Sequence, residues 1–267
     1  MCLILAGYGL HPTFPLVLAA NRDEFYARPA APAHFWEQFP DLFAGQDLSA
    51  GGTWMGIGAQ GRWAALTNFR DPAQPPASLS RGLLVRDYLT SALSPKEFWH
   101  QREKEPYGGC NLLFWDGRGL SYAANRGAPW RLLSPGLYGL SNHLLDTPWP
   151  KVVRAKAAFA RALADLGERW NPGAVGPFLQ LLADTRPAPD QELPHTGVSL
   201  DWERALSPIF IRTPDYGTRV STVLALDQTG CWHWAEQAFG PEGALGALQI
   251  REIPPGAQGP EMERSSA

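Results

Sequence analysis

The sequence contains little cysteine. Of its 267 residues, only Cys2, Cys110 and Cys231 are cysteines. They are too few and too scattered for a disulfide framework or for a tetrahedral zinc site. A reducing compartment is the simplest inference from this usage.

Long apolar runs and strong charge of either sign are also lacking. No segment reaches the ~18 continuous apolar residues of a membrane span. The apolar residues after Met1 stop at Gly7 without a preceding basic region, so we predict no signal peptide. The net charge is -3, the pI is about 6.1, and there is no basic tract, which argues against nucleic acid as a partner. We therefore expect a cytoplasmic protein that acts on a small molecule.

Two common ligand-binding motifs are missing as well. The histidines form no His-x-x-x-His pair and the cysteines no Cys-x-x-Cys pair, so we predict no metal site. Gly56-x-Gly58 lies in a hairpin pattern and opens no helix, which excludes a dinucleotide motif. Arginine greatly outnumbers lysine, and alanine and proline are abundant, which is typical of a GC-rich bacterial genome.

The composition that is present fits a soluble globular protein. Hydrophobic residues make up 45% and charged residues 18% of the chain, enough apolar material for a substantial core. We expect residues 1–253 to form a single domain. Residues 254–267 are polar and rich in proline and glycine, so we predict a disordered C-terminal tail.

Hydrophobic patterns predict hairpins that alternate with helices. The strand pairs are expected at 1–6 with 16–25, 51–58 with 62–68, 110–115 with 120–124, and 132–133 with 137–142. Helical patterns cover 80–92, a short segment from Pro95, 151–166 and 175–183, and closing strands are expected at 209–211, 219–226 and 231–235. We interpret 26–47 and 186–194 as loops. This order predicts an α+β fold in which two antiparallel sheets pack face to face with helices on both outer sides, a four-layer α/β/β/α sandwich.

Several of these strands end in a polar residue. The second strand runs into Asn21, Arg22, Asp23 and Glu24, and later strands end at Asn68 and Asn142. Asparagine at a strand end is usually turn chemistry, and an exposed Arg–Asp pair is worth only ~0–1 kcal/mol. The alternative is that these groups meet in one polar site.

Cys2 is the candidate nucleophile. Removal of Met1 would leave Cys2 with both a thiol and a free α-amine. A free thiol has a pKa of ~8.5 and an α-amine one of ~7.7–8.0, so the amine can accept the thiol proton near neutral pH. The alternative is that Cys2 is a small buried apolar residue.

Six motifs together resemble a known family. They are Met-Cys-Leu-Ile at 1–4, Asn-Arg-Asp-Glu at 21–24, Gly-Gly-Thr-Trp-Met-Gly at 51–56, Ala-Leu-Thr-Asn at 65–68, Leu-Ser-Asn at 140–142 and Tyr-Gly-Thr-Arg at 216–219. From Met1 to about Phe239 the chain resembles the NRDE family, also called the transport and Golgi organisation protein 2 family. That family is placed among the N-terminal nucleophile (Ntn) hydrolases, and the chain is more distantly similar to choloylglycine hydrolases and penicillin V acylases. The resemblance implies the four-layer fold and cleavage of linear amides.

The resemblance also implies roles for individual residues. Cys2 matches the nucleophile and Asp23 the aspartate that hydrogen-bonds it. Asn68 and Asn142 match the two asparagines, and Arg219 matches the late arginine. Asparagine amides suit the oxyanion of a tetrahedral intermediate, and a nearby guanidinium favours a thiolate.

Four further residues are candidates for substrate binding: Asn21, Arg22, Trp54 and His143. Trp54 also fits sheet packing, and a lone histidine such as His143 is often only hydrogen-bonded. The chain departs from the choloylglycine branch at one charged position. That branch has an arginine immediately before the asparagine of the turn. Here that position is Ala20, and the arginine is Arg22.

Two functions follow from these expectations. The first is an N-terminal cysteine amidohydrolase that cleaves a non-peptide linear C–N bond through a thioester and needs no cofactor. The alternative is a ligand-binding or trafficking protein without catalysis. For that alternative the family resemblance implies haem, or acyl-lipid and acyl-CoA homeostasis.

Overall fold

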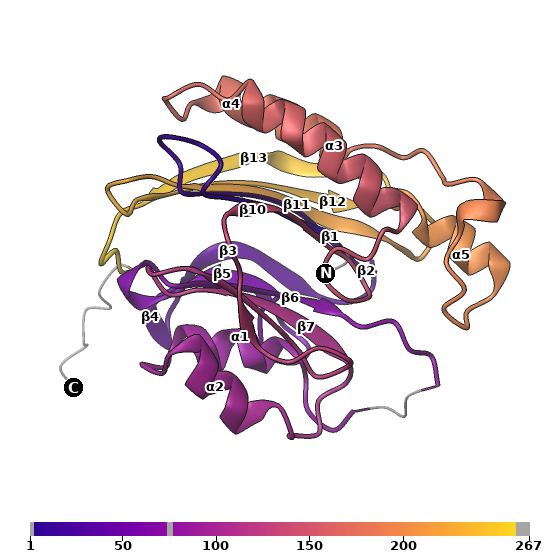
Figure 1. Ribbon diagram of the computed structural model, residues 1–267, viewed down its shortest axis with the longest axis horizontal. Coiled ribbons are helices and arrows are strands. Elements are labelled where there is room, and N and C mark those ends of the chain that lie inside the picture. The colour runs from indigo at the N-terminus through magenta and orange to yellow at the C-terminus, as the bar shows by residue number, and fades with distance from the viewer. Residues whose placement is uncertain (1–2, 74–76, 260–267) are drawn as a thin grey trace.

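Two antiparallel sheets lie face to face, and helices cover the outer face of each (Figure 1). The computed structural model describes residues 3–73 and 77–259. The expected α/β/β/α sandwich is confirmed, and it is the scaffold that positions every candidate residue discussed below.

The first sheet has six strands in the order β10-β1-β2-β11-β12-β13. Their bounds are Leu3–Tyr8 for β1, Leu16–Phe25 for β2, Gly136–Leu140 for β10, Tyr216–Leu226 for β11, Trp232–Gly240 for β12 and Gly243–Ile253 for β13. The predicted N-terminal hairpin is confirmed as β1 and β2.

The second sheet has seven strands in the order β3-β4-β5-β6-β7-β8-β9. Their bounds are Ala30–Trp36 for β3, Phe39–Asp47 for β4, Met55–Ile57 for β5, Trp63–Asn68 for β6, Cys110–Trp115 for β7, Leu120–Ala124 for β8 and Arg131–Leu132 for β9. Each strand pairs with the next strand along the chain, and α1 and α2 lie in the long connection between β6 and β7.

Helices form the outer layers. Helices α3 and α4 cover the six-stranded sheet, α1 and α2 cover the seven-stranded sheet, and α5 lies at one end of the sandwich (Figure 1). The bounds are Gly82–Leu89 for α1, Pro95–Arg102 for α2, Pro150–Ala164 for α3, Pro172–Leu182 for α4 and Leu200–Leu206 for α5, with 3-10 turns at Ala59–Gly61 and Asp190–Glu192. A capping box formed by Ser94 and Glu97 begins α2.

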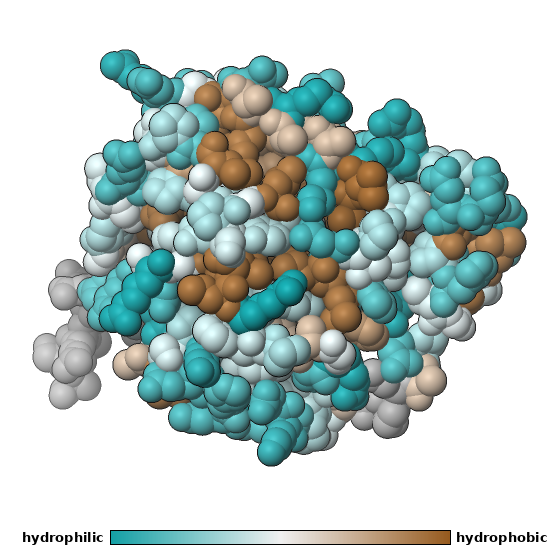
Figure 2. All heavy atoms as spheres, viewed as in Figure 1, coloured by the Kyte–Doolittle hydropathy of each residue, from teal (hydrophilic) through white to brown (hydrophobic). Residues whose placement is uncertain are grey.

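The apolar side chains fall into three cores, one between the sheets and one under each helical layer. The face seen in Figure 2 is mainly hydrophilic and carries several apolar patches. Across residues 3–73 and 77–259, we find no helix with the length and hydrophobicity of a membrane span.

Strand β1 is buried on both faces. Leu3 and Leu5 point into the core under α3 and α4, whereas Ile4 and Ala6 point into the core between the sheets. A strand buried on both faces reads as a continuous apolar run, because successive side chains alternate between the faces. This explains why the opening segment of the sequence shows no polar alternation.

Several expectations for individual segments were wrong. Segment 26–47, interpreted as a loop, contains the hairpin β3–β4. Strands β9 and β10 do not pair with each other. The turn between them carries the chain from one sheet to the other, so the two strands belong to different sheets. Segment 209–211 forms no strand, and β13 and α5 were not expected.

The predicted disorder of the C-terminal tail is also wrong for its first residues. The Gly259 N–H donates to the Pro40 carbonyl at 2.9 Å, and Gln258 Nε2 donates to Asp41 Oδ1 at 2.6 Å. These bonds hold residues 254–259 against β4, although their composition offers no periodic pattern. The remainder of that segment, from residue 260, lies outside the described residues.

Glu236 joins the two sheets. This buried side chain of β12 accepts a 2.9 Å hydrogen bond at Oε1 from the Ala33 N–H of β3. The register of β3 shifts between Ala31 and His34, which frees that N–H from the β3–β4 ladder. Burial raises the pKa of Glu236, and the bond from Ala33 only partly opposes this.

We predict that Glu236→Gln stabilises the protein at neutral pH. A carboxyl with a raised folded-state pKa binds a proton more tightly in the folded chain, so its contribution falls as pH rises through that pKa, by up to ~1.4 kcal/mol per unit of elevation. Gln keeps the acceptor for Ala33 without the buried charge. Melting temperatures at pH 7.5 should favour the variant, and the advantage should vanish near pH 4. A lower melting temperature at pH 7.5 would contradict this.

Candidate functional site

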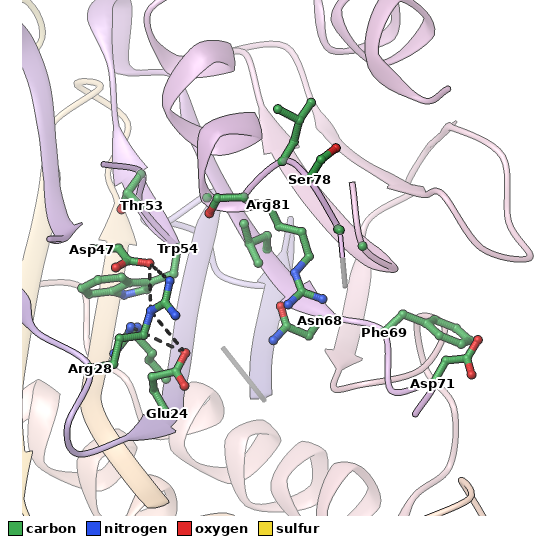
Figure 3. Close-up of a pocket in the computed structure, with 17 residues that line it drawn as sticks. Glu24, Arg28, Asp47, Thr53, Trp54, Asn68, Phe69, Asp71, Ser78 and Arg81 are labelled. Carbon is green, nitrogen blue, oxygen red and sulfur yellow. Dashed lines mark hydrogen bonds and ion pairs between the residues drawn. The ribbon is translucent and has the colours of Figure 1, made fainter. Parts of the chain in front are cut away.

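A polar pocket of about 560 Å3 lies at the end of β2 and β6. Its charged lining consists of three arginines and three carboxylates: Arg22, Arg28, Arg81, Glu24, Asp47 and Asp71. Thr53, Trp54, Asn68 and Phe69 complete the wall that Figure 3 shows. Such a balance of charges suits a polar ligand better than a purely apolar one.

The sandwich brings the polar strand ends together here. In the six-stranded sheet, Leu3 pairs with Asn21 and Ile4 with Leu140, so the start of β1 lies beside the end of β2 and the end of β10. Asn142 then crosses to the other sheet, where its Nδ2 donates to the Asn68 carbonyl at 3.0 Å. The two predicted asparagines are therefore neighbours, and Asn68 lines the pocket. Cys2, the predicted nucleophile, lies outside the described residues.

Asp23 is held rigidly at the end of β2. It is 4% exposed, and its Oδ1 accepts a 2.6 Å hydrogen bond from Thr218 Oγ1 on β11. The same threonine hydroxyl accepts from the Ile211 N–H. Thr218 thus fixes the direction of the carboxylate, as an orienting partner of a site residue does.

Arg22 is a buried guanidinium in the pocket wall. It is 4% exposed and lies 4.3 Å from the ring centroid of Trp54. Burial lowers the pKa of Arg22, while Glu24 and Asp47 raise it, and arginine remains charged. Its Nη2 is 4.0 Å from Glu24, and its Nη1 has no hydrogen-bond partner among the described residues. A buried donor without a partner is costly, by about 1–3 kcal/mol.

Trp54 occupies a space left by a glycine. A side-chain carbon on Gly45 of β4 would fall 2.4 Å from the Trp54 ring. Glycine at position 45 therefore leaves room for the indole, over whose ring the Arg22 guanidinium lies. Trp54 combines the two roles expected of it, because it is 4% exposed and also lines the pocket.

Arg28 and its carboxylate partners were missed in the sequence. Arg28 Nη2 donates to Asp47 Oδ2 at 2.7 Å, and its Nε lies 3.8 Å from Glu24 Oε2 (Figure 3). The hydrogen bond to Asp47 raises the pKa of Arg28. The missed strand β4 carries Asp47, so the error in segment 26–47 concealed this pair. Arg81, just before α1, donates to the Gly109 carbonyl and points toward Asn68 in Figure 3.

Two predicted residues lie away from the pocket wall. The Asn21 amide donates to the carbonyls of Leu182 and Ile209 and accepts from Ser221, which joins β2 to the α4 layer. These bonds give Asn21 a structural role. Arg219 donates to the carbonyls of Phe25, Tyr26 and Arg28, so it holds the turn that follows β2.

His143 lies behind the pocket. Its ring is 4.9 Å from that of Phe69 and 6.0 Å from that of Trp149, and its Nδ1 is 2.8 Å from Thr147 Oγ1. Phe69, which lines the pocket, would lie between His143 and a ligand.

The two described cysteines lack the surroundings of a nucleophile. Cys110 is fully buried, and burial raises its pKa to about 12. Cys231 is half-buried at the other end of the six-stranded sheet, and burial with Asp227 and Glu252 raises its pKa. Reactive cysteines sit in electropositive surroundings instead.

The two packed sheets with their helical layers define an Ntn-hydrolase fold. Solved structures support this assignment, since a mutant of the conjugated bile acid hydrolase from Clostridium perfringens superposes with a TM-score of 0.53 over 95% of this chain and 92% of that one. The identity is 9%, so this likeness concerns the fold alone.

The family is narrower than the fold. The pattern of the family described as Transport and Golgi organisation 2 matches residues 1–241. The Transport and Golgi organization protein 2 homologs of Bos taurus and Homo sapiens are 36% and 34% identical, each over 90% of this chain and 93% of the relative. The chain belongs to the Transport and Golgi organisation 2 family. These relatives come from animals, so the bacterial source stays a prediction.

We predict that Gly45→Ala displaces Trp54 from the pocket wall. Crowding of a packed core costs about 1–3 kcal/mol, so urea unfolding should show a loss of this size, together with a changed tryptophan emission. Gly167→Ala, in the exposed turn after α3, is the control, because a side-chain carbon there meets nothing within 4 Å. That change should alter stability by no more than about 0.5 kcal/mol. Equal effects of the two substitutions would refute this account of Gly45.

Proposed function

We propose that this protein is an N-terminal cysteine amidohydrolase acting on a small linear amide. The observation that carries the proposal is that Asn68 lines a polar pocket and accepts a hydrogen bond from Asn142, close to the point where β1 begins. Removal of Met1 would give Cys2 a free α-amine beside its thiol. The Ntn-hydrolase fold is consistent with this chemistry.

The proposed cycle has two steps. The Cys2 thiol gives its proton to the α-amine, and the sulfur attacks the amide carbon; the C–N bond breaks as the amine leaves with that proton. Water then attacks the thioester, which releases a carboxylic acid and restores the thiol. Asn142 has a second amide hydrogen beyond the one it gives to Asn68, so it can donate to the oxyanion. Asp23 would orient the α-ammonium.

Arg22 supports a substrate class. Its unpartnered Nη1 in a buried position calls for an acceptor on the ligand, and a charged acceptor gives the stronger bond. We propose that the substrate is an N-acyl compound with a carboxylate or other anionic group. Trp54 would hold the guanidinium plane in position for it.

A second candidate is supported by the family description, which names transport and Golgi organisation. In that case the pocket binds and carries its ligand without cleaving it. Haem is a possible ligand under this candidate, with His143 as the residue to test. Retained ligand binding in a wild-type protein that has no turnover and keeps Met1 would favour this second function.

We predict that turnover depends on Cys2. Intact mass should show that active protein lacks Met1, and Cys2→Ala should lower kcat/KM for an N-acyl amide by at least about 1,000-fold, because no other group supplies the nucleophile. The control is Cys231→Ala, whose thiol lies at the far end of the sheet and should leave turnover intact. Full activity in protein that retains Met1 would disprove the mechanism.

A second prediction concerns Arg22. Arg22→Met should raise KM about 10–100-fold for an N-acyl amino acid, which corresponds to the roughly 1.5–3 kcal/mol of a charge-assisted hydrogen bond. It should change KM little for the neutral amide with the same acyl group. Arg118→Met, an exposed arginine in the β7–β8 turn, is the control. Equal losses for the charged and neutral substrates would mean that Arg22 only supports the fold.

A further inference from the structure

The hairpin between β11 and β12 gathers three side chains that can ligate a metal. The candidate ligand atoms of Asp227, Cys231 and His233 all lie within 4.8 Å of one another. These residues do not line the polar pocket, and they lie at the Leu226 end of β11, whereas the pocket lies near its Tyr216 end. We propose that Asp227, Cys231 and His233 bind a divalent transition-metal ion of the zinc class, with water as the fourth ligand.

The spacing of the oxygen and nitrogen ligands fits such an ion. Asp227 Oδ2 lies 3.1 Å from His233 Nε2. Bonds of about 2.0–2.2 Å at tetrahedral angles separate neighbouring ligands by roughly 3.3 Å. One ion can therefore sit between these two atoms with little movement. The Cys231 sulfur lies within 4.8 Å of both atoms and would have to move closer to reach a bond length of roughly 2.3 Å.

The hairpin already orients the carboxylate. Asp227 Oδ1 accepts hydrogen bonds from the Thr229 N–H at 2.8 Å, the Thr229 hydroxyl at 2.6 Å and the Cys231 N–H at 3.0 Å. These three donors occupy Oδ1 and leave Oδ2 directed at His233. The Asp227 carboxylate therefore already has a fixed orientation in which Oδ2 can act as a ligand.

The imidazole is also fixed, and its second nitrogen faces a carboxylate. His233 stacks on Trp170 with ring centroids 5.8 Å apart and meets the edge of Phe14 at 6.2 Å. Its Nδ1 is buried, makes no hydrogen bond to a described residue, and lies 3.6 Å from Glu252 Oε1 on β13. A metal-bound histidine usually gives its other N–H to a carboxylate. Metal at Nε2 would fix the tautomer that puts the proton on Nδ1, toward Glu252.

The local charge favours a cation. Asp227 and Glu252 are the carboxylates around His233 and Cys231, and a bound divalent ion would be attracted by both. The simpler explanation, a histidine bonded to a turn aspartate, accounts for the Asp227 contact. It does not account for the position of His233 Nδ1 or for the adjacent Cys231 thiol.

The test is a titration of the full-length chain with Zn2+ by calorimetry and with Co2+ by absorbance. All proteins carry Cys2→Ser, so that an N-terminal thiol contributes no signal. We expect one ion per chain and a near-ultraviolet sulfur-to-cobalt band. Cys231→Ser should remove the band, His233→Ala should weaken Zn2+ binding by about 100-fold, and Glu252→Gln should weaken it by about 10-fold. Zn2+ should raise the melting temperature of the parent by more than that of His233→Ala.

Controls make either outcome decisive. His100→Ala changes an exposed histidine on α2 and should leave the Zn2+ affinity unchanged. Circular dichroism of each metal-free variant shows whether it folds, and Glu252→Gln keeps the shape of an exposed side chain and removes only its charge. Absence of binding to the folded parent, or a cobalt band that persists in Cys231→Ser, would overturn the proposal.

Discussion

The burial of β1 between β2 and β10 is the constraint on which the site depends. Both faces of β1 are packed against apolar cores, so its register is strongly specified: a slip of one residue would turn every side chain to the wrong face. The observed register sets Leu3 opposite Asn21 and Ile4 opposite Leu140. The polar ends of β2 and β10 therefore reach the point where β1 begins, and the hydrophobic core determines the position of the polar groups.

The alternation of side chains along a strand also explains where the positive charge of Arg22 lies. Ala20 and Arg22 lie two residues apart on β2 and point to the same face. Ala20 is part of the core between the sheets, where a guanidinium would have apolar neighbours. Moving the arginine by two residues shifts it about 6.6 Å along the strand. There it meets Trp54, Glu24 and the pocket.

The sequence predicted those parts of the fold whose signals are local. Three of the four predicted hairpins, β1–β2, β5–β6 and β7–β8, were confirmed. The β3–β4 hairpin was missed because Ala, Pro and Gly interrupt its pattern, and β10 was misassigned because its partner β1 is more than 130 residues away in the sequence. Sheet membership is a tertiary property that propensity cannot supply.

The candidate site was also predicted only in part, because only some of its residues carry a local signal in the sequence. Asn68, Asn142, Asp23, Arg22 and Trp54 were all selected from strand ends or motifs, and the structure gathers them around one end of the sandwich. Asn21 had the same signal as Arg22, yet alternation directs its amide toward α4. Arg28 and Asp47 were not selected, because their pairing depends on strand β4.

The register shift in β11 gives Arg219 an indirect role. Between Thr218 and Val220 the ladder to β2 is displaced by one residue, so Arg219 is the extra residue of a bulge. Its side chain leaves the ladder and donates to three carbonyls of the turn after β2, including that of Arg28. Meanwhile Thr218, on the other side of the shift, orients Asp23. One bulge thus places a carboxylate of the site and fixes the turn that carries Arg28, so Arg219 acts on the pocket by positioning its wall rather than by touching its contents.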